Sequence, residues 1–506
     1  MNVLIVQQLA WGQRIGHEVA KTLNADGHTL AAMVHGLEAY RHVQGQSDVA
    51  YKDVLFVDPL YDEGQQTVSV EQVREIETRY GVDSVWRLIY GDRVLVFSFR
   101  SSRRFLAQKP VSDGHALSVC WRTYQAIRRL MDGVRPDVVL APVIGSLANY
   151  LLYLEARHRG IPCFTIGATR FDQNLFIADD LFLGSRNIAE RFDALRTDPT
   201  LSPMYERALA VYQRLRRKDG DTRPTYMAVV ERKPWSRRVL RDTARDVALL
   251  GPRLLRSLIT PRRVMGFETI WLPSGSRWHA ARNVLVALRE RFRATDSQGP
   301  CHRHLGELDK PFVYFPLHFE PELTLLVFAP EYANQLEVCR RFALSLPAGT
   351  RLVVKEHPAM VASRPAEFYH ALRGLPNVDL VHSSVASHEI FNHPGCRAVV
   401  VISSTVGFEA AMNGRAVVML GPGDYGRLPA VYPAASLDDA VSRLRQLSTQ
   451  TTASDVADVD RPNLAYICAQ LEESFSFDYF QRWTTGGGHI DARTLVAAFY
   501  KRVGTA

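Results

Sequence analysis

Short apolar runs alternate with helix-period segments in separate stretches of the chain, and this alternation limits the fold more than any other feature. Near the N-terminus, the run VLIVQQL is followed by a helical pattern over 15–23 and then by LAAMVH. The same order recurs over 136–167 and over 310–421. Strands that alternate with helices predict mostly parallel sheets covered by helices on both faces. The sequence therefore predicts an α/β fold with two doubly wound domains.

The chain has 506 residues, which is too long for a single hydrophobic core. We expect an N-terminal α/β domain over 1–205 and a basic helical insertion or linker over 206–305. A C-terminal α/β domain should follow over 306–446, and then a loop and C-terminal helices over 447–506. Within the first domain, 68–132 should be mostly helical.

The basic character of the chain is concentrated in the insertion. The net charge of +8 favours an anionic partner. Residues 231–263 hold ten lysines and arginines against three acidic residues, with leucines and valines between them. This segment is either a pair of amphipathic helices on an anionic membrane surface or the solvated face of a helical hairpin. Nucleic acid is not expected as a partner, because the run lacks interleaved aromatic residues and no reading module is visible.

Cysteine usage and hydropathy indicate the compartment. The six cysteines are scattered without a C-x-x-C pair, so we expect no disulfide framework and no zinc site. The N-terminus lacks the basic region of a signal peptide, and no apolar run reaches the length of about 18 residues that suggests a membrane span. We expect a cytoplasmic protein, with at most peripheral contact with the inner membrane.

Three polar motifs follow apolar runs of the second α/β stretch. They are LHFEPE (317–322), KEHP (355–358) and SSTVGFEA (403–410). The carboxyl ends of parallel strands lie along one sheet edge, where open α/β sheets bind ligands, so we expect these motifs to converge.

SSTVGFEA ends a strand where a helix begins. Ser403, Ser404 and Thr405 stand at the junction, and the free amides of a helix N-terminus can bind a phosphate. Gly407 would let the backbone approach a ligand closely, and Glu409 could reach ribose hydroxyls. The alternative is ordinary helix capping.

KEHP and LHFEPE offer charged and titratable groups. Lys355 supplies a point charge for a phosphate, His357 can donate to it or protonate a leaving group, and Pro358 fixes the turn. The alternative for His357 is a histidine satisfied within its loop. His318 and Glu320 of LHFEPE are candidates for general acid or base, or else they position a sugar or cap a helix.

The N-terminal loop QQLAWGQRIGHE contains Gly12 and Gly16 but is not a G-x-G-x-x-G motif. Glycines that let a strand turn into a helix are the favoured interpretation.

Over roughly 310–430, the chain resembles the capsule polysaccharide biosynthesis family. The motifs of the family occur here in the same order as in its members, in the quoted segments and in YFPLHFEPE, VVVISSTVGFEAAMNG and DYG. Its members are cytoplasmic glycosyltransferases of GT-B architecture, including Kdo transferases of capsule and lipopolysaccharide assembly. The resemblance implies a GT-B-like fold, with two Rossmann-type domains facing a cleft. The C-terminal domain would hold the nucleotide and the N-terminal domain the acceptor.

The resemblance also assigns residues. The family's His-Pro motif falls on His357 and Pro358, and its serine/threonine phosphate motif falls on 403–405. Its Gln-Pro motif matches Glu320 and Pro321, so this chain carries Glu where Gln is usual, a departure that bears on donor recognition.

We therefore expect a metal-independent glycosyltransferase that transfers a sugar from a nucleotide donor to a surface polysaccharide or glycolipid. No D-x-D motif suggests a catalytic metal, and no cofactor besides the donor is expected. The expected donor-binding residues are Lys355, His357, Pro358, Ser403, Ser404, Thr405 and Glu409. The catalytic candidates are Glu320, His318 and Glu18, with His17 and Asp172 as further options.

Two other functions fit the same residues. One is a nucleotide-sugar 2-epimerase or polyol-phosphate transferase of the same fold, and the other is a non-catalytic scaffold of a capsule assembly complex. The sequence leaves open the donor, for which a CMP-sugar is one candidate. It also leaves open the acceptor, the stereochemical outcome, the catalytic base or nucleophile and the oligomeric state.

Overall fold

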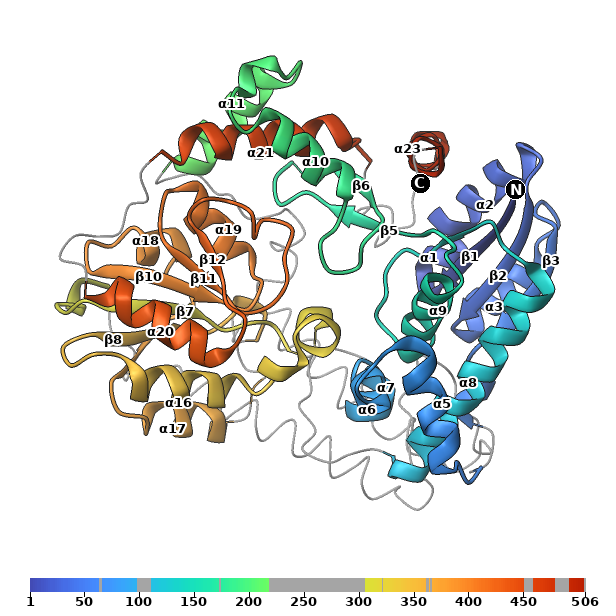
Figure 1. The fold of residues 1–506 in the computed structure, drawn as a ribbon, viewed down its shortest axis with the longest axis horizontal. Coiled ribbons are helices and arrows are strands. Elements are labelled where there is room, and N and C mark those ends of the chain that lie inside the picture. The colour runs from blue at the N-terminus through green and yellow to red at the C-terminus, as the bar shows by residue number, and fades with distance from the viewer. Residues whose placement is uncertain are drawn as a thin grey trace, which may run out of the picture.

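The structure is a computed structural model of the chain. It describes residues 1–62, 66–97, 111–172, 174–217, 305–320, 322–360, 364, 366–449, 458–477 and 491–504. Two six-stranded sheets lie in separate halves of the molecule, each surrounded by helices (Figure 1).

The N-terminal sheet has the strand order β3-β2-β1-β4-β5-β6. Its strands are β1 (Asn2–Gln8), β2 (Thr29–His35), β3 (Tyr51–Phe56), β4 (Val138–Leu140), β5 (Cys163–Ala168) and β6 (Leu175–Ala178). The first five are parallel, and β6 pairs with β5 in the antiparallel direction. The order of the parallel strands is that of a Rossmann-type sheet.

The C-terminal sheet has the order β12-β11-β10-β7-β8-β9, and all its pairs are parallel. Its strands are β7 (Phe312–Pro316), β8 (Arg351–Lys355), β9 (Val378–Val381), β10 (Cys396–Val401), β11 (Val417–Met419) and β12 (Val431–Pro433). Counted along the chain, this is again the Rossmann arrangement. The prediction of two doubly wound α/β domains is confirmed.

Helices connect and cover the strands. In the first half they are α1 (Leu9–Gln13), α2 (Ile15–Ala25), α3 (Leu37–Gly45), α4 (Pro59–Asp62), α5 (Val70–Tyr80), α6 (Val85–Tyr90), α7 (Arg93–Phe97), α8 (Asp113–Val134), α9 (Leu147–His158), α10 (Arg186–Leu195) and α11 (Tyr205–Arg216). In the second half they are α16 (Gln335–Ser345), α17 (Ala366–Arg373), α18 (Ser387–Phe391), α19 (Thr405–Met412), α20 (Leu437–Ser448), α21 (Asp460–Glu473) and α23 (Arg493–Val503). Short 3-10 turns occur at Pro199–Leu201, Leu305–Glu307, Pro330–Tyr332 and Pro358–Met360, and a π-helical turn at Thr324–Phe328.

The central strands are apolar because both faces of each sheet are buried. In β1, Val3 and Ile5 belong to one hydrophobic core, while Leu4 and Val6 belong to the core on the other face. Successive side chains of a strand point to opposite faces, so a strand covered on both sides needs a continuous apolar run. This is why β1 and β7 stand out in the sequence.

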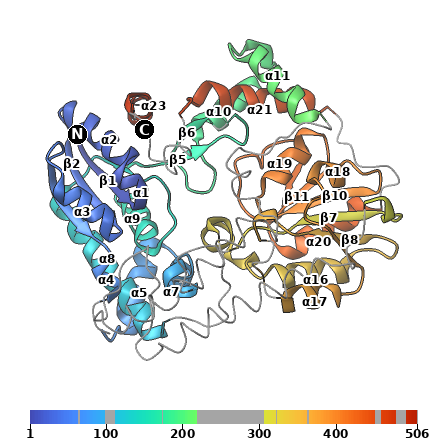
Figure 2. The same ribbon diagram turned by 180° about the vertical axis from the view of Figure 1, so that it is seen from behind.

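The packing of the later helices crosses between the two halves. Helices α10 and α11 pack against α21, and all three contribute to the core around the C-terminal sheet. The last helix, α23, instead packs on the N-terminal sheet, with Leu495, Val496 and Phe499 in the same core as β1. Both chain ends therefore lie in the N-terminal half (Figure 2).

Some elements differ from the sequence-based expectation. The sequence-based expectation does not include the edge strands β3 and β6; β3 exposes Lys52 and Asp53. The prediction of helices at the C-terminus does not hold for residues 474–477, which follow α21. Phe475 is extended instead and exchanges two backbone hydrogen bonds with Leu175, because β6 offers an open edge to it.

Most of the predicted basic insertion, including 231–263, lies outside the described residues. Its first part forms α11. The five cysteines in the described ranges are free and buried. In the part of the chain that the structure describes, no helix is long and apolar enough to span a membrane.

Candidate functional site

The three polar motifs lie at one edge of the C-terminal sheet. Strands β7, β8 and β10 end at Pro316, Lys355 and Val401, and the motifs follow directly. The pairing is parallel and places Pro316 beside Lys355. The strand order reverses between β7 and β10, and such a switch point is where open α/β sheets bind ligands.

A buried arginine holds the first two turns together. The Arg364 side chain is only 1% exposed, and its Nε donates to Glu356 at 2.8 Å. Its Nη2 donates to the carbonyl of His318 at 2.6 Å. Tyr369 also donates its hydroxyl to Glu356, at 2.6 Å. The carboxylate in KEHP is therefore an internal partner of Arg364.

Glu320, the first catalytic candidate, has internal partners of its own. Its Oε1 lies 2.8 Å from Arg364 Nη1, and Gln335 donates to the same oxygen. The side chain is 8% exposed. This geometry favours a role in positioning the LHFEPE turn, and catalysis by Glu320 stays a prediction.

Hydrogen bonds hold the backbone of His318, whereas its side chain has a ring nitrogen without a hydrogen-bond partner among the described residues. Its amide donates to Gln335 at 2.7 Å, and its carbonyl accepts from Arg364. The ring is buried, and its Nε2 has no hydrogen-bond partner among the described residues. Burial, followed by the charges of His357, Arg364 and Arg170, lowers the pKa of His318 to about 3. This neutral imidazole can donate to or accept from a ligand.

His357 is also neutral at neutral pH. Burial lowers its pKa to about 4, and the positive charges of Arg364 and Lys355 act in the same direction. Its ring meets Phe319 edge-on, with 5.8 Å between ring centroids. Pro358 begins the short 3-10 turn that ends the motif. The cations that disfavour a charged His357 would attract a phosphate to this place.

Lys355 is buried at the end of β8. Its Nζ donates to Ser387 Oγ at 3.1 Å, and the same hydroxyl lies 3.1 Å from the hydroxyl of Tyr314. Burial raises the pKa of Tyr314, and the charge of Glu409 adds to this effect. Lys355 and Tyr314 therefore share the hydroxyl of Ser387.

The start of α19 matches the prediction, but not through capping. Ser404 is the N-cap residue and Thr405 the first helical residue, with Ser403 buried before them. The Ser404 hydroxyl makes no capping hydrogen bond. Its Oγ is buried and has no partner in the described ranges. This hydroxyl and the first amides of α19 form a set of groups that can receive an anion.

Gly407 serves internal packing, and the close approach of a ligand there stays a prediction. A Cβ at this position would lie 2.6 Å from the hydroxyl of Tyr425 and 2.7 Å from Val401 Cγ2. That hydroxyl donates to the carbonyl of Ser404 at 2.8 Å. The glycine thus lets Tyr425 hold the N-terminus of α19.

No interaction among the described residues joins the N-terminal candidates Glu18, His17 and Asp172 to the three motifs. Glu18 is a partly exposed residue of α2. His17 pairs with Asp48 at 3.2 Å, and Asp172 pairs with two arginines. Their catalytic roles stay predictions.

Gly16 of the N-terminal loop is also a packing residue. A Cβ there would lie 2.3 Å from Gln7 Oε1 and 2.4 Å from Trp11 Nε1. This close contact between strand and helix agrees with the favoured interpretation of the loop glycines.

Sequence reasoning missed the basic residues that the N-terminal half brings to the site. The π-helical turn after LHFEPE packs into the N-terminal core through Leu326 and Val327. Burial raises the pKa of the neighbouring Glu322, while the positive charges of Arg93 and Arg170 oppose this shift. Arg170 also reaches α19. One signal was available, since Arg170 follows the predicted strand IPCFTIG as the motifs follow theirs.

Within the ranges that the structure describes, no three His, Cys, Asp or Glu side chains are grouped to hold a metal ion. Metal independence stays a prediction.

Comparisons with known proteins bear on the second half of the chain. Residues 288–428 match the model of the family described as capsule polysaccharide biosynthesis protein. No curated protein matches the chain.

Several solved structures have a similar fold at low identity. The beta Kdo 2,7 transferase of Thermosulfurimonas dismutans KpsC is 13% identical, with 69% of this chain and 90% of that chain covered and a TM-score of 0.31. The UDP-GlcNAc 2-epimerase of Neisseria meningitidis bound to UDP-GlcNAc is 11% identical, with 93% and 98% covered and a TM-score of 0.24. The calicheamicin glycosyltransferase CalG4 is 14% identical, with 96% and 98% covered and a TM-score of 0.27. At such low TM-scores these similarities say nothing about activity.

The motifs and the family match agree on the same part of the chain. LHFEPE, KEHP, SSTVGFEA and DYG all lie inside the matched range. The match to the capsule polysaccharide biosynthesis family model therefore covers all of the motifs that suggested the resemblance.

Proposed function

We propose that the chain is a glycosyltransferase that moves a sugar from a nucleotide donor to a surface polysaccharide or glycolipid. The observation that carries this proposal is the uncapped, buried hydroxyl of Ser404 at the start of α19, at the switch point of the sheet. Lys355 and two neutral imidazoles belong to the adjoining strand ends. Amides, a point charge and ring N–H groups suit the charge that develops on a leaving nucleotide phosphate.

The remaining parts of the proposal rest on the sequence. The family match supports a role in capsule or related carbohydrate synthesis. The N-terminal domain would bind the acceptor, and the basic stretch 231–263 would keep the protein at the inner membrane surface, where a lipid-linked acceptor lies. The reaction would need no metal.

Calorimetric titration with CMP, UDP, GDP and dTDP tests the donor site. We expect one nucleotide to bind, and Ser404→Ala and His357→Ala to weaken it about tenfold or more, since a hydrogen bond to a charged group contributes roughly 1.5–3 kcal/mol. His370→Ala, an exposed histidine of α17, is the matched control and should bind like the wild type.

The outcomes separate the rival functions. If no nucleotide binds, the glycosyltransferase proposal fails and the scaffold hypothesis replaces it. If UDP binds and the protein converts a UDP-sugar to its 2-epimer without an acceptor, the epimerase is the correct function.

A further inference from the structure

The turn between β5 and β6 carries an arginine from the N-terminal half to α19. These two strands lie between the rest of their sheet and the C-terminal sheet (Figure 1). The amide of Thr169 donates to the carbonyl of Asn174 at 2.8 Å, which closes the turn. Phe171 is buried and stacks on Phe408 of α19, with 6.4 Å between centroids. Arg170 therefore has a fixed backbone beside α19.

The guanidinium of Arg170 is oriented by the C-terminal half. Its Nε and Nη2 donate to Asp424 Oδ1 at 3.1 and 2.8 Å, and its Nη1 lies 3.4 Å from Thr405 Oγ1. The group lies over the ring of Tyr425, 4.7 Å from the centroid. The hydroxyl of Tyr466 donates to the other oxygen of Asp424 at 3.0 Å.

This arrangement leaves part of the guanidinium open. Arginine has five N–H donors in a planar fork, and Asp424 occupies the side edge formed by Nε and Nη2. One N–H of Nη1 donates to Thr405 Oγ1, which leaves one N–H on Nη1 and one on Nη2 for the oxygens of an anion. The Arg170 side chain is partly exposed, at 21%.

Two independent observations point to a ligand at this place. The Ser404 hydroxyl, one residue before Thr405, is buried without a partner among the described residues. The ring of His318 is buried, and its Nε2 has no hydrogen-bond partner among the described residues. The positive charge of Arg170 is one of the effects that lower the pKa of this ring. Ser404 at the start of α19 and His318 after β7 thus each carry a buried polar atom that a ligand could satisfy.

We propose that Arg170 is a phosphate-binding residue of the donor site, contributed by the N-terminal domain, and that Asp424 and Tyr425 position it. This inference rests on the proposed function and gives the DYG motif a role. Tyr425 holds the carbonyl of Ser404 and lies under Arg170, while Asp424 sets the angle of the fork. The phosphate is then bound from both domains, so donor binding joins them.

The test compares ligands that differ in the phosphate. Wild type, Arg170→Ala, Arg170→Lys and Asp424→Asn are titrated with CMP, UDP, GDP and dTDP, with the matching nucleosides, and with pyrophosphate. Arg427→Ala is the matched control, because Arg427 belongs to the same loop and pairs with Asp193 at 2.8 Å with its side chain 52% exposed. The melting temperature of each variant is measured in parallel.

We expect Arg170→Ala to weaken nucleotide and pyrophosphate binding at least about tenfold and to change nucleoside binding less than about twofold, because only the phosphate contact is lost. Arg170→Lys should recover part of the loss, since lysine keeps the charge without the fork. Asp424→Asn should weaken the same ligands by a smaller factor. Arg427→Ala should match the wild type.

Other results overturn the inference. Unchanged nucleotide affinity in Arg170→Ala would do so, and the proposed function would still stand if Ser404→Ala loses binding. An equal loss of affinity for nucleosides and nucleotides would mean that Arg170 only stabilises the contact between the two halves. If the wild type binds neither nucleotides nor pyrophosphate, both the inference and the proposed function fail.

Discussion

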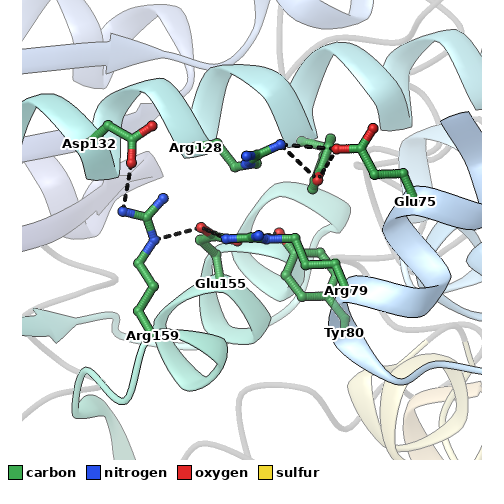
Figure 3. A network of polar contacts seen from close by, with 8 residues as sticks. Glu75, Arg79, Tyr80, Arg128, Asp132, Glu155 and Arg159 are labelled. Carbon is green, nitrogen blue, oxygen red and sulfur yellow. Dashed lines mark hydrogen bonds and ion pairs between the residues drawn. The ribbon is translucent and has the colours of Figure 1, made fainter.

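At the scale of single residues, Glu155 of α9 lies at the centre of a charge network in the N-terminal domain (Figure 3). Arg79 donates to both of its oxygens at 2.8 Å, Tyr80 donates at 2.8 Å, and Arg159 donates at 2.6 Å. The Glu155 side chain is 0% exposed. Burial alone would raise the pKa of Glu155, but the bonds from Arg79, Arg159 and Tyr80 outweigh it and lower the pKa to about 2.

Glu155→Gln should therefore destabilise the protein by about 3 kcal/mol at neutral pH, the low end for breaking a buried ion pair. The folded pKa lies below the unfolded value of about 4.3, so the carboxylate stabilises the fold above that pH. This contribution is lost as the pH falls from about 4 towards 2. Urea denaturation of both proteins between pH 7 and pH 3 measures the difference, which should shrink over this window.

Glu75→Gln is the control for this prediction. Glu75 pairs with Arg128 beside the Glu155 group, and its side chain is 45% exposed (Figure 3). Its removal should change stability by less than about 1 kcal/mol. Equal effects of the two variants would contradict the assignment of the main role to Glu155.

At the scale of elements, α19 depends on a glycine that allows close packing. An alanine inside a helix is usually more stable than a glycine by about 1 kcal/mol. At Gly407, however, a Cβ would lie within 3 Å of Tyr425 and Val401, so the neighbours must shift. Overpacking of this kind costs about 1–3 kcal/mol and should win.

We therefore expect Gly407→Ala to lower the melting temperature and also to weaken nucleotide binding, because Tyr425 would release the carbonyl of Ser404. Gly133→Ala in α8 is the matched control. A Cβ at Gly133 meets nothing within 4 Å, so this variant should be as stable as the wild type or slightly more stable. Nucleotide affinity unaffected by Gly407→Ala would argue against a ligand at the start of α19.

The elements also show where sequence patterns suffice. The central strands β1, β7, β8 and β10 appear as apolar runs because both of their faces are buried. The edge strand β3 carries exposed polar residues and pairs with β2, the strand before it in the chain. Pairing of this kind depends on the tertiary fold, so no local pattern predicts it.

At the scale of the whole molecule, the chain end stabilises the first domain. Phe499 of α23 is fully buried against Phe164, with 5.9 Å between ring centroids and the planes at 87°. Tyr500 adds a hydrogen bond of 2.6 Å from its hydroxyl to Asp26. The first and last described elements therefore share one core.

Phe499→Ala should destabilise the N-terminal domain by about 3–5 kcal/mol, the usual effect of removing a buried aromatic ring. Hydrogen exchange measured by mass spectrometry should show faster exchange in 2–8, although the substitution lies at the other end of the chain. Thr494→Ala, on the exposed face of α23, is the control and should leave this exchange unchanged. Fast exchange confined to α23 would show that the helix is only loosely attached.

The sequence by itself determined the two α/β domains and the common edge of the three motifs. Apolar runs specify strands buried on both faces, and parallel strands bring their carboxyl ends together whatever the loops contain. It did not determine which polar groups turn inward. Glu320 and Glu356 pair with Arg364, while Ser404 keeps an open hydroxyl. Arg170 meets α19 across 235 residues of sequence. Only the tertiary structure decides such contacts, because they form where the surfaces of separately patterned elements meet.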